Sequence, residues 1–356
     1  MKKSDTRWTS RDIAAAAGVS QATVSNVLNR PEIVSVETRE RVYASIREMN
    51  FVVNESARTL RAGRSRTLGV IVLDLTNPFW GEVTRGVSDA AAARGYSVLL
   101  GSSGESRKRE QDLLRLFEEH RVDGVLVSSV DVGSSAIEAL NHHGITVVLL
   151  DQCDTSGRYS SVSLDQVGGA RLIAEHLLVE GHRRIGFINV SREVWWSRER
   201  LRGLREAILA KGEDPEIVIT EMTVATMTAR TAEPALSDLL SSAPDVTAVV
   251  CVNDMVALGV LKRLRDLKLA VPQDMSVVGF DDSYFAGLLS PALTTVRQQP
   301  YLLGKTAAEL VIDRSPTDLV KTIVYEPALI IRESTWNNSS GQATDSRMHP
   351  DLSRRN

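Results

Sequence analysis

The chain has 356 residues, 43% of them hydrophobic and 24% charged, which excludes a largely disordered protein and favours two or three domains. The first residues, MKKSDTRWTSRD, contain no apolar signal segment, and no apolar run reaches the length of a membrane span, so we expect a cytoplasmic protein with no membrane partner. The net charge of −3 excludes a uniformly basic nucleic-acid binder but hides an asymmetry. Residues 1–66 hold 12 Lys and Arg against 7 Asp and Glu, whereas the remaining 290 hold 30 against 38. We therefore expect nucleic-acid contact from a basic head and not from the acidic body.

Three short helices are predicted in the head, residues 1–53. Residues suited to helix starts and stops follow one another as Thr9 with Asp12, Gly18, Ser20 and Ser35. The short turn after Gly18 makes the first two helices a helix-turn-helix, and the second runs to about Leu28. Its outer face carries amides and hydroxyls instead of charge. The expected small core consists of apolar residues at helical spacing: Ile13, Ala14, Ala17, Val19, Val24, Val27, Leu28, Val42 and Ile46.

Residues 54–66 form a predicted linker whose apolar residues are Ala57, Leu60 and Ala62. A helix of about two turns without a core face is marginal alone, because nucleation is costly. We expect this segment to be ordered only where a partner templates it; the alternative is a plain flexible linker. The polar tail, residues 336–356, is expected to be disordered.

The body, residues 67–335, alternates apolar strand-like runs with amphipathic helical stretches, from TLGVIVLDL and GEVTRGVSDAAAARG to MSVVGFDD and TTVRQQP. Repeated strand–helix units predict parallel sheets with helices on both faces. The fold class is therefore α/β, a small all-α head followed by a body of two doubly wound lobes.

Motifs for catalysis and metal binding are weak. The stretch from Leu303 to Thr306 resembles half of a phosphate-binding loop, but Gln299 stands where that motif needs glycine. Neither a dinucleotide fingerprint nor a nucleophile elbow is present. The histidines at 142, 143, 176 and 182 lack ligand spacing, and Cys153 and Cys251 are expected to be reduced, buried thiols. We expect no enzyme activity, no metal and no cofactor.

Polar residues follow the carboxyl ends of several predicted strands, where ligands of open α/β sheets bind. Each could be a mere helix cap, but with Arg200 and neighbouring aromatic residues they favour a cleft for a polyhydroxylated ligand, whose apolar faces stack while its hydroxyls take forked hydrogen bonds. The expected effector-binding residues are Asn77, Phe79, Trp80, Ser102, Ser128, Asp151, Trp195, Arg200, Asn253 and Asp281, with Asp74, Asp254 and Trp196 beside them. Asp281 and Asp282 are adjacent, so their carboxylates should point in different directions.

Several motifs in fixed order make the chain similar to the LacI/GalR family of bacterial transcription repressors. They are DIAAAAGVSQATVSNVLN, VSVETRERV, ARTLRAGRSRTLGVIVLDLTNPFW, GFDDS, PALTTVRQQP and EPALIIRES. The resemblance covers about residues 8 to 335. It implies a DNA-binding head, a hinge helix that forms on operator DNA, and a body similar to periplasmic sugar-binding proteins. The implied N-lobe is about residues 67–163 plus 296–326, and the C-lobe about 164–295 plus 327–335.

The resemblance also implies roles for single residues. Base edges would be contacted by Gln21, Ala22 and Asn26, with Leu60 of the hinge wedged into the minor groove. DNA phosphates would be contacted by Thr9, Ser20, Thr23, Ser25 and Asn29. In the body, Arg200 and Asp281 would grasp the effector, Asp151 and Asn253 would line the pocket, and Phe79 and Trp80 its mouth. Trp195 and Trp196 have no clear counterpart in the family.

Two departures from the family bear on function. Asn26 stands where many members carry arginine, and asparagine favours adenine. The tail lacks the leucine heptads that make some members tetramers, so we expect a homodimer. The expected function is a repressor released from a pseudo-palindromic operator by a small molecule, a sugar or derivative. A co-repressed or activating regulator and, more remotely, a sugar-binding or sugar-modifying enzyme are the alternatives. The effector, the operator and the regulated genes stay open.

Overall fold

A computed structural model describes residues 8–51, 65–154, 156–315 and 319–335. The chain divides into two units, Met1–Ser65 and Arg66–Asn356, which are treated separately as the head and the body. Most of the expected hinge, including Leu60, and all of the tail from residue 336 lie outside the described residues.

The head contains α1 (Ser10–Ala17), α2 (Gln21–Asn29), a 3₁₀ turn η1 (Pro31–Ile33) and α3 (Val36–Glu48). The predicted capping box is confirmed, because the Thr9 hydroxyl accepts from the Asp12 amide while the Asp12 carboxylate accepts from the Thr9 amide at 2.8 Å. Gly18 ends α1 with a left-handed φ of 63°, a conformation that glycine adopts without strain. Ser20 and Ser35 cap α2 and α3 as expected.

The head encloses a small apolar core. All nine expected core residues contribute, with Ile13, Val24, Val27 and Val42 wholly buried, and Val34, Met49 and Phe51 complete it. The outer face of α2 is thereby fixed by the packing of its inner face.

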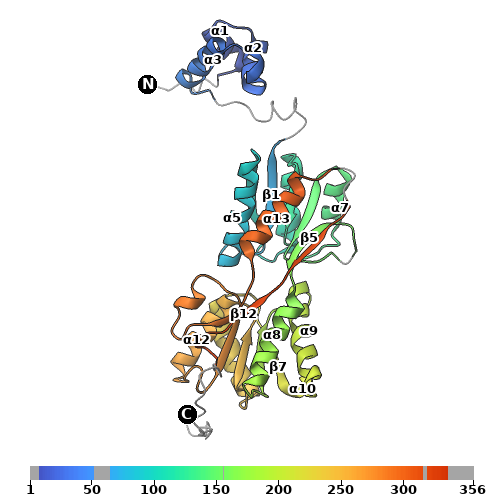
Figure 1. Cartoon of the computed structure of the whole chain (residues 1–356), viewed down its shortest axis with the longest axis vertical. Helices are drawn as coiled ribbons and strands as arrows, with labels where there is room; N and C mark the ends of the chain where they lie inside the picture. The colour runs from blue at the N-terminus through green and yellow to red at the C-terminus, as the bar shows by residue number, and fades with distance from the viewer. Residues whose placement is uncertain (1–7, 52–64, 155, 316–318, 336–356) are drawn as a thin grey trace. The chain divides into compact units, whose positions relative to one another are not determined.

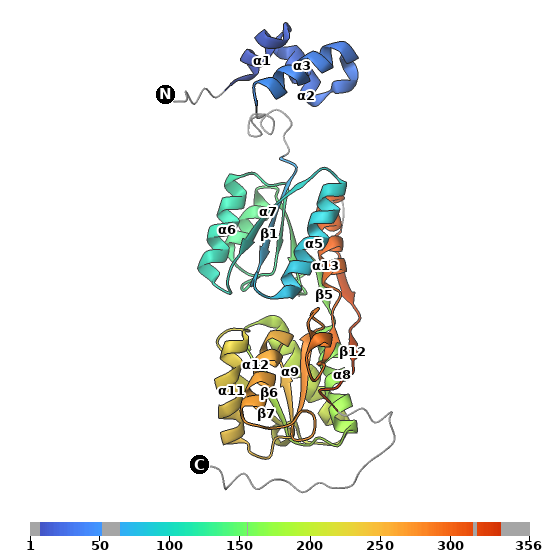
Figure 2. The ribbon, with the colours of Figure 1, turned by 90° about the vertical axis from the view of Figure 1, so that its left-hand side faces the viewer.

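The first sheet of the body has the strand order β11-β5-β4-β3-β1-β2 and is parallel throughout. Its strands are β1 (Thr67–Val72), β2 (Ser97–Ser102), β3 (Gly124–Val127), β4 (Thr146–Leu150), β5 (Ser160–Leu164) and β11 (Thr322–Tyr325). Figures 1 and 2 show helices on both faces of this sheet. Its helices are α5 (Pro78–Ala93), α6 (Arg107–Glu119), α7 (Ser135–His142) and α13 (Pro300–Ile312).

The second sheet has the order β12-β10-β9-β8-β6-β7, parallel except for the β10–β12 pair. Its strands are β6 (Ile185–Asn189), β7 (Ile219–Thr223), β8 (Ala248–Cys251), β9 (Ser276–Asp281), β10 (Thr294–Arg297) and β12 (Ala328–Ile330). The helices are α8 (Gln166–Val179), α9 (Trp195–Ala210), α10 (Pro215–Val218), α11 (Ala229–Ser242) and α12 (Asp254–Asp266), with the 3₁₀ turn η2 (Ala286–Leu288). Two doubly wound lobes confirm the expected fold class.

The chain passes between the two sheets three times: after β5, after β10 and after β11. The expected second crossing, before residue 296, cuts through β10, which pairs with β9 as far as Arg297. The crossing therefore follows Arg297, because the ladder of the second sheet holds that residue.

Helices α5 and α13 pack unusually closely. A Cβ on Gly86 would lie 2.0 Å from the Tyr301 carbonyl oxygen, and one on Gly304 would lie 2.0 Å from that of Val83. Only glycine permits this approach at either position. Gly304 thus lies inside a helix and serves packing, which rules out the phosphate-loop interpretation of residues 303–306.

Within the described part of the chain, no helix is both long and apolar enough to cross a membrane. Both cysteines are free thiols; Cys251 is buried as expected, but Cys153 is only partly buried.

Candidate functional site

The outer face of α2 is the first candidate site. Gln21, Ala22 and Asn26 are all exposed on it, while Val24 and Val27 point into the head core. The Gln21 amide donates to the Ser10 hydroxyl at 2.8 Å, so one of the expected base-reading side chains is held against the start of α1. The α2 helix thus presents an uncharged face of an amide pair and a methyl group.

Four of the five residues expected at DNA phosphates lie at helix ends, and Ser25 lies in the middle of α2. The Thr9 and Ser20 hydroxyls cap α1 and α2, and the Ser20 and Thr23 hydroxyls lie 2.9 Å apart. Ser25 is partly buried on α2, and Asn29 ends that helix, with its side chain outside the described structure. Short donors at helix N-termini suit phosphate oxygens, which the helix dipole also favours.

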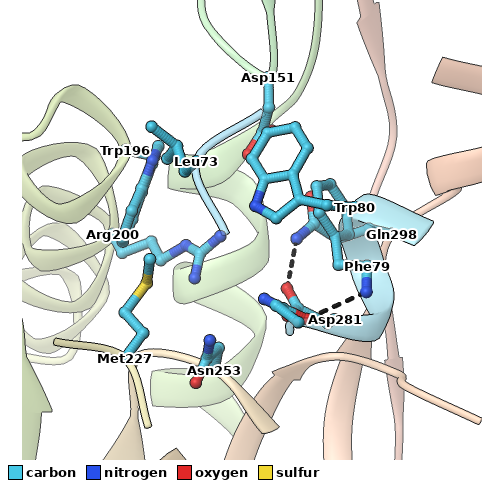
Figure 3. A pocket seen from close by; sticks show the side chains of 11 residues that line it. Leu73, Phe79, Trp80, Asp151, Trp196, Arg200, Met227, Asn253, Asp281 and Gln298 are labelled. Carbon is cyan, nitrogen blue, oxygen red and sulfur yellow. Dashed lines mark hydrogen bonds between the residues drawn. The ribbon is translucent and has the colours of Figure 1, made fainter. Parts of the chain in front are cut away.

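A pocket of about 280 Å³ in the body is the second candidate site (Figure 3). Residues from both lobes line it. Seven of the ten expected effector-binding residues do so: Asn77, Phe79, Trp80, Asp151, Arg200, Asn253 and Asp281. Four others join them: Leu73, Trp196, Met227 and Gln298.

Arg200 is the buried cation of this pocket, with 4% of its surface exposed. Its guanidinium carbon lies 3.5 Å from the ring centre of Phe280 and 5.0 Å from that of Trp196. Its Nε donates to Gln166 at 2.8 Å, and Nη1 donates to the Val252 carbonyl. Burial lowers the pKa of Arg200 to about 10, which keeps the guanidinium charged at neutral pH. Stacking and hydrogen bonds fix this plane where a ligand can meet it.

Asp151 and Asp281 are the buried acids of the pocket, one from each lobe. Asp151 follows β4 and Asp281 is the last residue of β9. Both have a positive φ, 52° and 123°, a conformation that costs a non-glycine residue energy and is frequent at functional sites. Burial raises the pKa of Asp151 to about 7 and that of Asp281 to about 6, although the charge of Arg200 opposes both shifts. Near neutral pH the pocket therefore holds one fixed cation and two carboxyl groups whose pKa values lie close to the pH.

Asp281 and its neighbours occupy different places, as their adjacency predicts. The Asp281 carboxylate accepts from Gln298 at 2.7 Å and from Asn77 at 3.4 Å (Figure 3). Asp282 turns away and pairs with Arg297 and Arg332. Asp254 is wholly buried; it accepts from the Thr295 hydroxyl and the Ser283 amide, and burial raises its pKa well above the usual range. Only the first of the three acids reaches the pocket.

Two lining residues each bury a polar atom that has no partner among the described residues: the amide nitrogen of Asn253 and the amide oxygen of Gln298. The Asn253 oxygen caps α12 by accepting from the Val256 amide at 2.9 Å, which leaves the nitrogen on the pocket side (Figure 3). The Gln298 nitrogen is taken by Asp281, which leaves its oxygen. Both side chains are at least 96% buried, and an unsatisfied buried polar group costs about 1–3 kcal/mol. The pocket is thus short of one acceptor and one donor.

Aromatic rings flank the polar groups. Phe79 and Trp80 lie edge to face with centroids 4.9 Å apart, and in Figure 3 Trp196 lies on the opposite side of the pocket from Trp80. The expectation for Trp195 was wrong in one respect: that side chain packs against the apolar core and does not line the pocket. Trp196 takes the place because it precedes Arg200 by four residues and shares its helix face, a spacing that the sequence already contained.

Ser102 and Ser128 are also not brought to the pocket. Ser102 ends the edge strand β2, and its hydroxyl donates to the Leu73 carbonyl at 3.1 Å. Ser128 follows β3 and is wholly buried outside the lining. Gln298 was missed although it fits the strand-end pattern, since it directly follows β10 within the TTVRQQP motif. Met227 precedes α11, a helix that the sequence pattern did not single out.

Two family profiles match the chain. The profile described as bacterial regulatory proteins, lacI family, matches residues 9–54, and a periplasmic binding protein-like domain matches residues 174–335. The HTH-type transcriptional repressor PurR of Vibrio vulnificus is 32% identical over 331 residues, which cover 92% of this chain and 98% of that protein.

Solved structures agree. A transcriptional regulator CelR–cellobiose complex has a TM-score of 0.69 and 33% identity, covering 92% of this chain and 100% of that one. The lac repressor dimer bound to operator and the anti-inducer ONPF has a TM-score of 0.79 and 26% identity, with 93% and 100% covered.

Proposed function

Because this chain belongs to the LacI family of bacterial DNA-binding transcriptional repressors, we propose that it binds a pseudo-palindromic operator as a homodimer in the cytoplasm and releases it when a sugar occupies the pocket. Since the relatives are regulators, the enzyme alternative falls away. The observation that carries the effector class is a pair of atoms without partners in the described part of the chain, the Asn253 nitrogen and the Gln298 oxygen. A hydroxyl group accepts from the first and donates to the second, so a polyol satisfies both.

The remaining lining supports the same ligand class. Asp281, Asp151 and Arg200 offer acceptors and a planar donor that suit vicinal hydroxyls, and the aromatic rings suit the apolar face of a sugar ring. One of the similar structures is named as a cellobiose complex.

On the DNA side, the proposal assigns base contacts to the exposed α2 residues Gln21, Ala22 and Asn26. Asn26 would read adenine through its paired donor and acceptor. Thr9, Ser20, Thr23, Ser25 and Asn29 would hold phosphates, and paired Leu60 side chains, outside the described residues, would kink the operator centre. Two heads of a dimer would enter successive major-groove faces.

The first sheet of the body gives the homodimer physical support. Its edge strand β2 exposes Leu99 and Leu100 to 38% and 42% of their surface. A parallel sheet is ordinarily covered on both faces, so exposed leucines beside an open edge favour a partner surface. The lac repressor, to which the chain is similar, was solved as a dimer on its operator.

The first experiment is a thermal-shift screen of the full chain with D-ribose, D-glucose, D-galactose and cellobiose. A sugar that binds only the folded state must raise the unfolding midpoint. Asn253→Asp keeps the oxygen that caps α12 and replaces the free donor with an acceptor, so it should weaken the binding of the active sugar about 10- to 100-fold. The assigned ligand class would be contradicted if none of the four sugars raised the midpoint, or if Asn253→Asp bound the active sugar with wild-type affinity.

The second experiment concerns DNA. Enrichment from a random-sequence pool should recover a pseudo-palindrome, and Leu60→Ala should weaken its binding. If no palindrome is enriched, or if Leu60→Ala has no effect, the operator scheme is wrong. The co-repressor alternative is decided by sign, because a sugar that strengthens operator binding makes this chain a co-repressed regulator.

A further inference from the structure

The three crossings between the lobes are short. Asp165 alone separates β5 from α8, Gln298 and Gln299 separate β10 from α13, and residues 326–327 separate β11 from β12. The first and third crossings are joined, since the Asp165 amide donates to the Tyr325 carbonyl at 2.9 Å. Any rotation of one lobe against the other must be absorbed at these few residues, as hinge motions generally are.

Gln166 lies at the first crossing, as the first residue of α8, and 1% of it is exposed. Its amide nitrogen donates to Asp151 at 2.9 Å, and its amide oxygen accepts from Arg200 Nε at 2.8 Å. Asp151 follows a strand of the first lobe and Arg200 lies on a helix of the second. One side chain at a crossing therefore joins the acid of one lobe to the cation of the other.

The orientation of this amide is fixed by chemistry. A guanidinium only donates, so the Gln166 oxygen must face Arg200 and the nitrogen must face Asp151. Gln166 is not among the residues that line the pocket, whereas Gln298, at the second crossing, lines it and holds Asp281 at 2.7 Å. The two glutamines thus differ: Gln298 lines the pocket, whereas Gln166 lies outside the lining and holds two residues that do line it, Asp151 and Arg200.

We propose that Gln166 is a positioning residue that transmits occupancy of the pocket to the crossing between the lobes. A ligand that draws Asp151 or Arg200 toward itself pulls on one end of the Gln166 amide. Because Gln166 begins α8 directly after Asp165, the movement changes the backbone at the first crossing between the lobes. This inference rests on the proposed sugar-regulated function and adds that ligand affinity and ligand response are separable in this chain.

The test compares three variants of the full-length protein. Gln166→Met keeps the packing volume but loses both hydrogen bonds, and Gln166→Glu keeps the acceptor for Arg200 but loses the donor to Asp151. Gln299→Met is the matched control. Gln299 occupies the second crossing with an exposed side chain. Two quantities are measured for the sugar that raises the wild-type midpoint: its dissociation constant, and the fold-change in operator affinity that it causes at saturation. Wild-type coupling is expected on the order of 5- to 150-fold.

We expect both position-166 variants to bind the sugar within about tenfold of wild type while the fold-change in operator affinity falls toward one. Gln299→Met should match wild type in both quantities. Retained coupling in the position-166 variants overturns the proposal, and so does a loss of sugar affinity well beyond tenfold, because Gln166 would then act as part of the binding site.

Failure of the proposed function is recognised separately. If no sugar in the panel shifts the wild-type midpoint, the same variants are compared by amide hydrogen exchange without ligand. Faster exchange in Gln166→Met both at residues 151–153 and at the start of α9, unmatched in Gln299→Met, supports the connection between lobes. Faster exchange confined to the start of α8 overturns it.

Discussion

On α2 of the head, the side chains expected to read DNA are exposed and uncharged, whereas the pocket of the body buries Arg200, Asp151 and Asp281. Polar groups of the head find partners within the head: the Thr9 and Ser20 hydroxyls accept from backbone amides three residues further along the chain, and the Gln21 amide donates to the Ser10 hydroxyl. The pocket joins residues far apart in the chain, and two of its amide atoms lack partners among the described residues. A surface for DNA can be complete before its partner arrives, but a site for a small ligand leaves bonds for the ligand to make.

The same contrast governs stability. The head is a separate unit, and α2 keeps its position only while the small core of the head is folded. In the body, burying charged groups in the pocket costs free energy, which the larger apolar cores offset. Perturbing the two regions should therefore give different kinds of result.

The largest effect is expected from Ile13→Ala in the head. Ile13 is wholly buried, and truncating such a side chain costs about 2–5 kcal/mol, which a core of this size cannot spare. Operator binding should be lost while the melting transition and sugar binding of the body stay unchanged. Ile33→Ala, at a residue 61% exposed, is the control. Calorimetry that showed the body melting earlier in Ile13→Ala would mean that the two units are not independent.

The second prediction concerns pH. Asp151 has a folded-state pKa of about 7 against about 3.9 when unfolded, so between these values the folded body holds a proton that the unfolded chain has lost. The contribution of Asp151 to the free energy of unfolding should fall as pH rises from about 4 to 7, by on the order of 4 kcal/mol, and Asp151→Asn should remove this contribution. The raised pKa of Asp281 should leave a further fall of the same sign in the variant.

The head should respond with the opposite sign. Hydrogen bonds from Thr9 lower the pKa of Asp12, so this group stabilises the head above the unfolded pKa and loses that effect as pH falls. Denaturant unfolding of wild type and Asp151→Asn at several pH values checks both signs. Parallel curves for the two proteins would show that Asp151 is ionised throughout.

The third prediction concerns the pocket cation. Arg200→Met keeps a long side chain between Phe280 and Trp196 but removes every donor, so sugar affinity should fall about 100-fold or more, a loss typical of removing one partner from a buried charge pair. Arg198→Met, on the same helix with its side chain 55% exposed, should be neutral. Isothermal titration of the two variants separates the outcomes; affinity within threefold of wild type in Arg200→Met would remove Arg200 from the site.

The smallest effect is expected from Asn26→Arg on α2. Arginine prefers guanine, so one operator position should shift from adenine to guanine with a discrimination of about 1–3 kcal/mol. The preferred sequence is measured by enrichment from a random pool for both proteins. An unchanged preference would show that Asn26 reads nothing.

The head could be predicted almost completely from the sequence, because its determinants are local. Thr9 and Ser20 lie within three residues of the amides they cap, and the core residues repeat at helical spacing. In the body, strands with continuous apolar runs were predicted, but β5 and β7 were not. The β5 sequence SSVSL is serine-rich yet wholly buried, because its hydroxyls find partners such as Lys321 and Cys153 that only the fold brings near.

The pocket was predicted in part for a related reason. Strand-end acids and amides could be recognised from chain pattern, so Asn77, Asp151 and Asn253 were found. Gln166 could not, since it begins a helix and its role comes from the crossing between the lobes. Gln298 follows β10 directly, so the same pattern could have identified it. Ser102 matched the pattern but lies on the edge strand, a placement that depends on strand order.

The central claim, that the head and the pocket belong to one regulated switch, is tested most directly by the operator affinity of the full-length protein across a titration of the active sugar. We expect affinity to fall 5- to 150-fold as the sugar saturates, with a midpoint at its own dissociation constant in the presence of DNA. Operator affinity that is unchanged at saturating sugar would contradict the account.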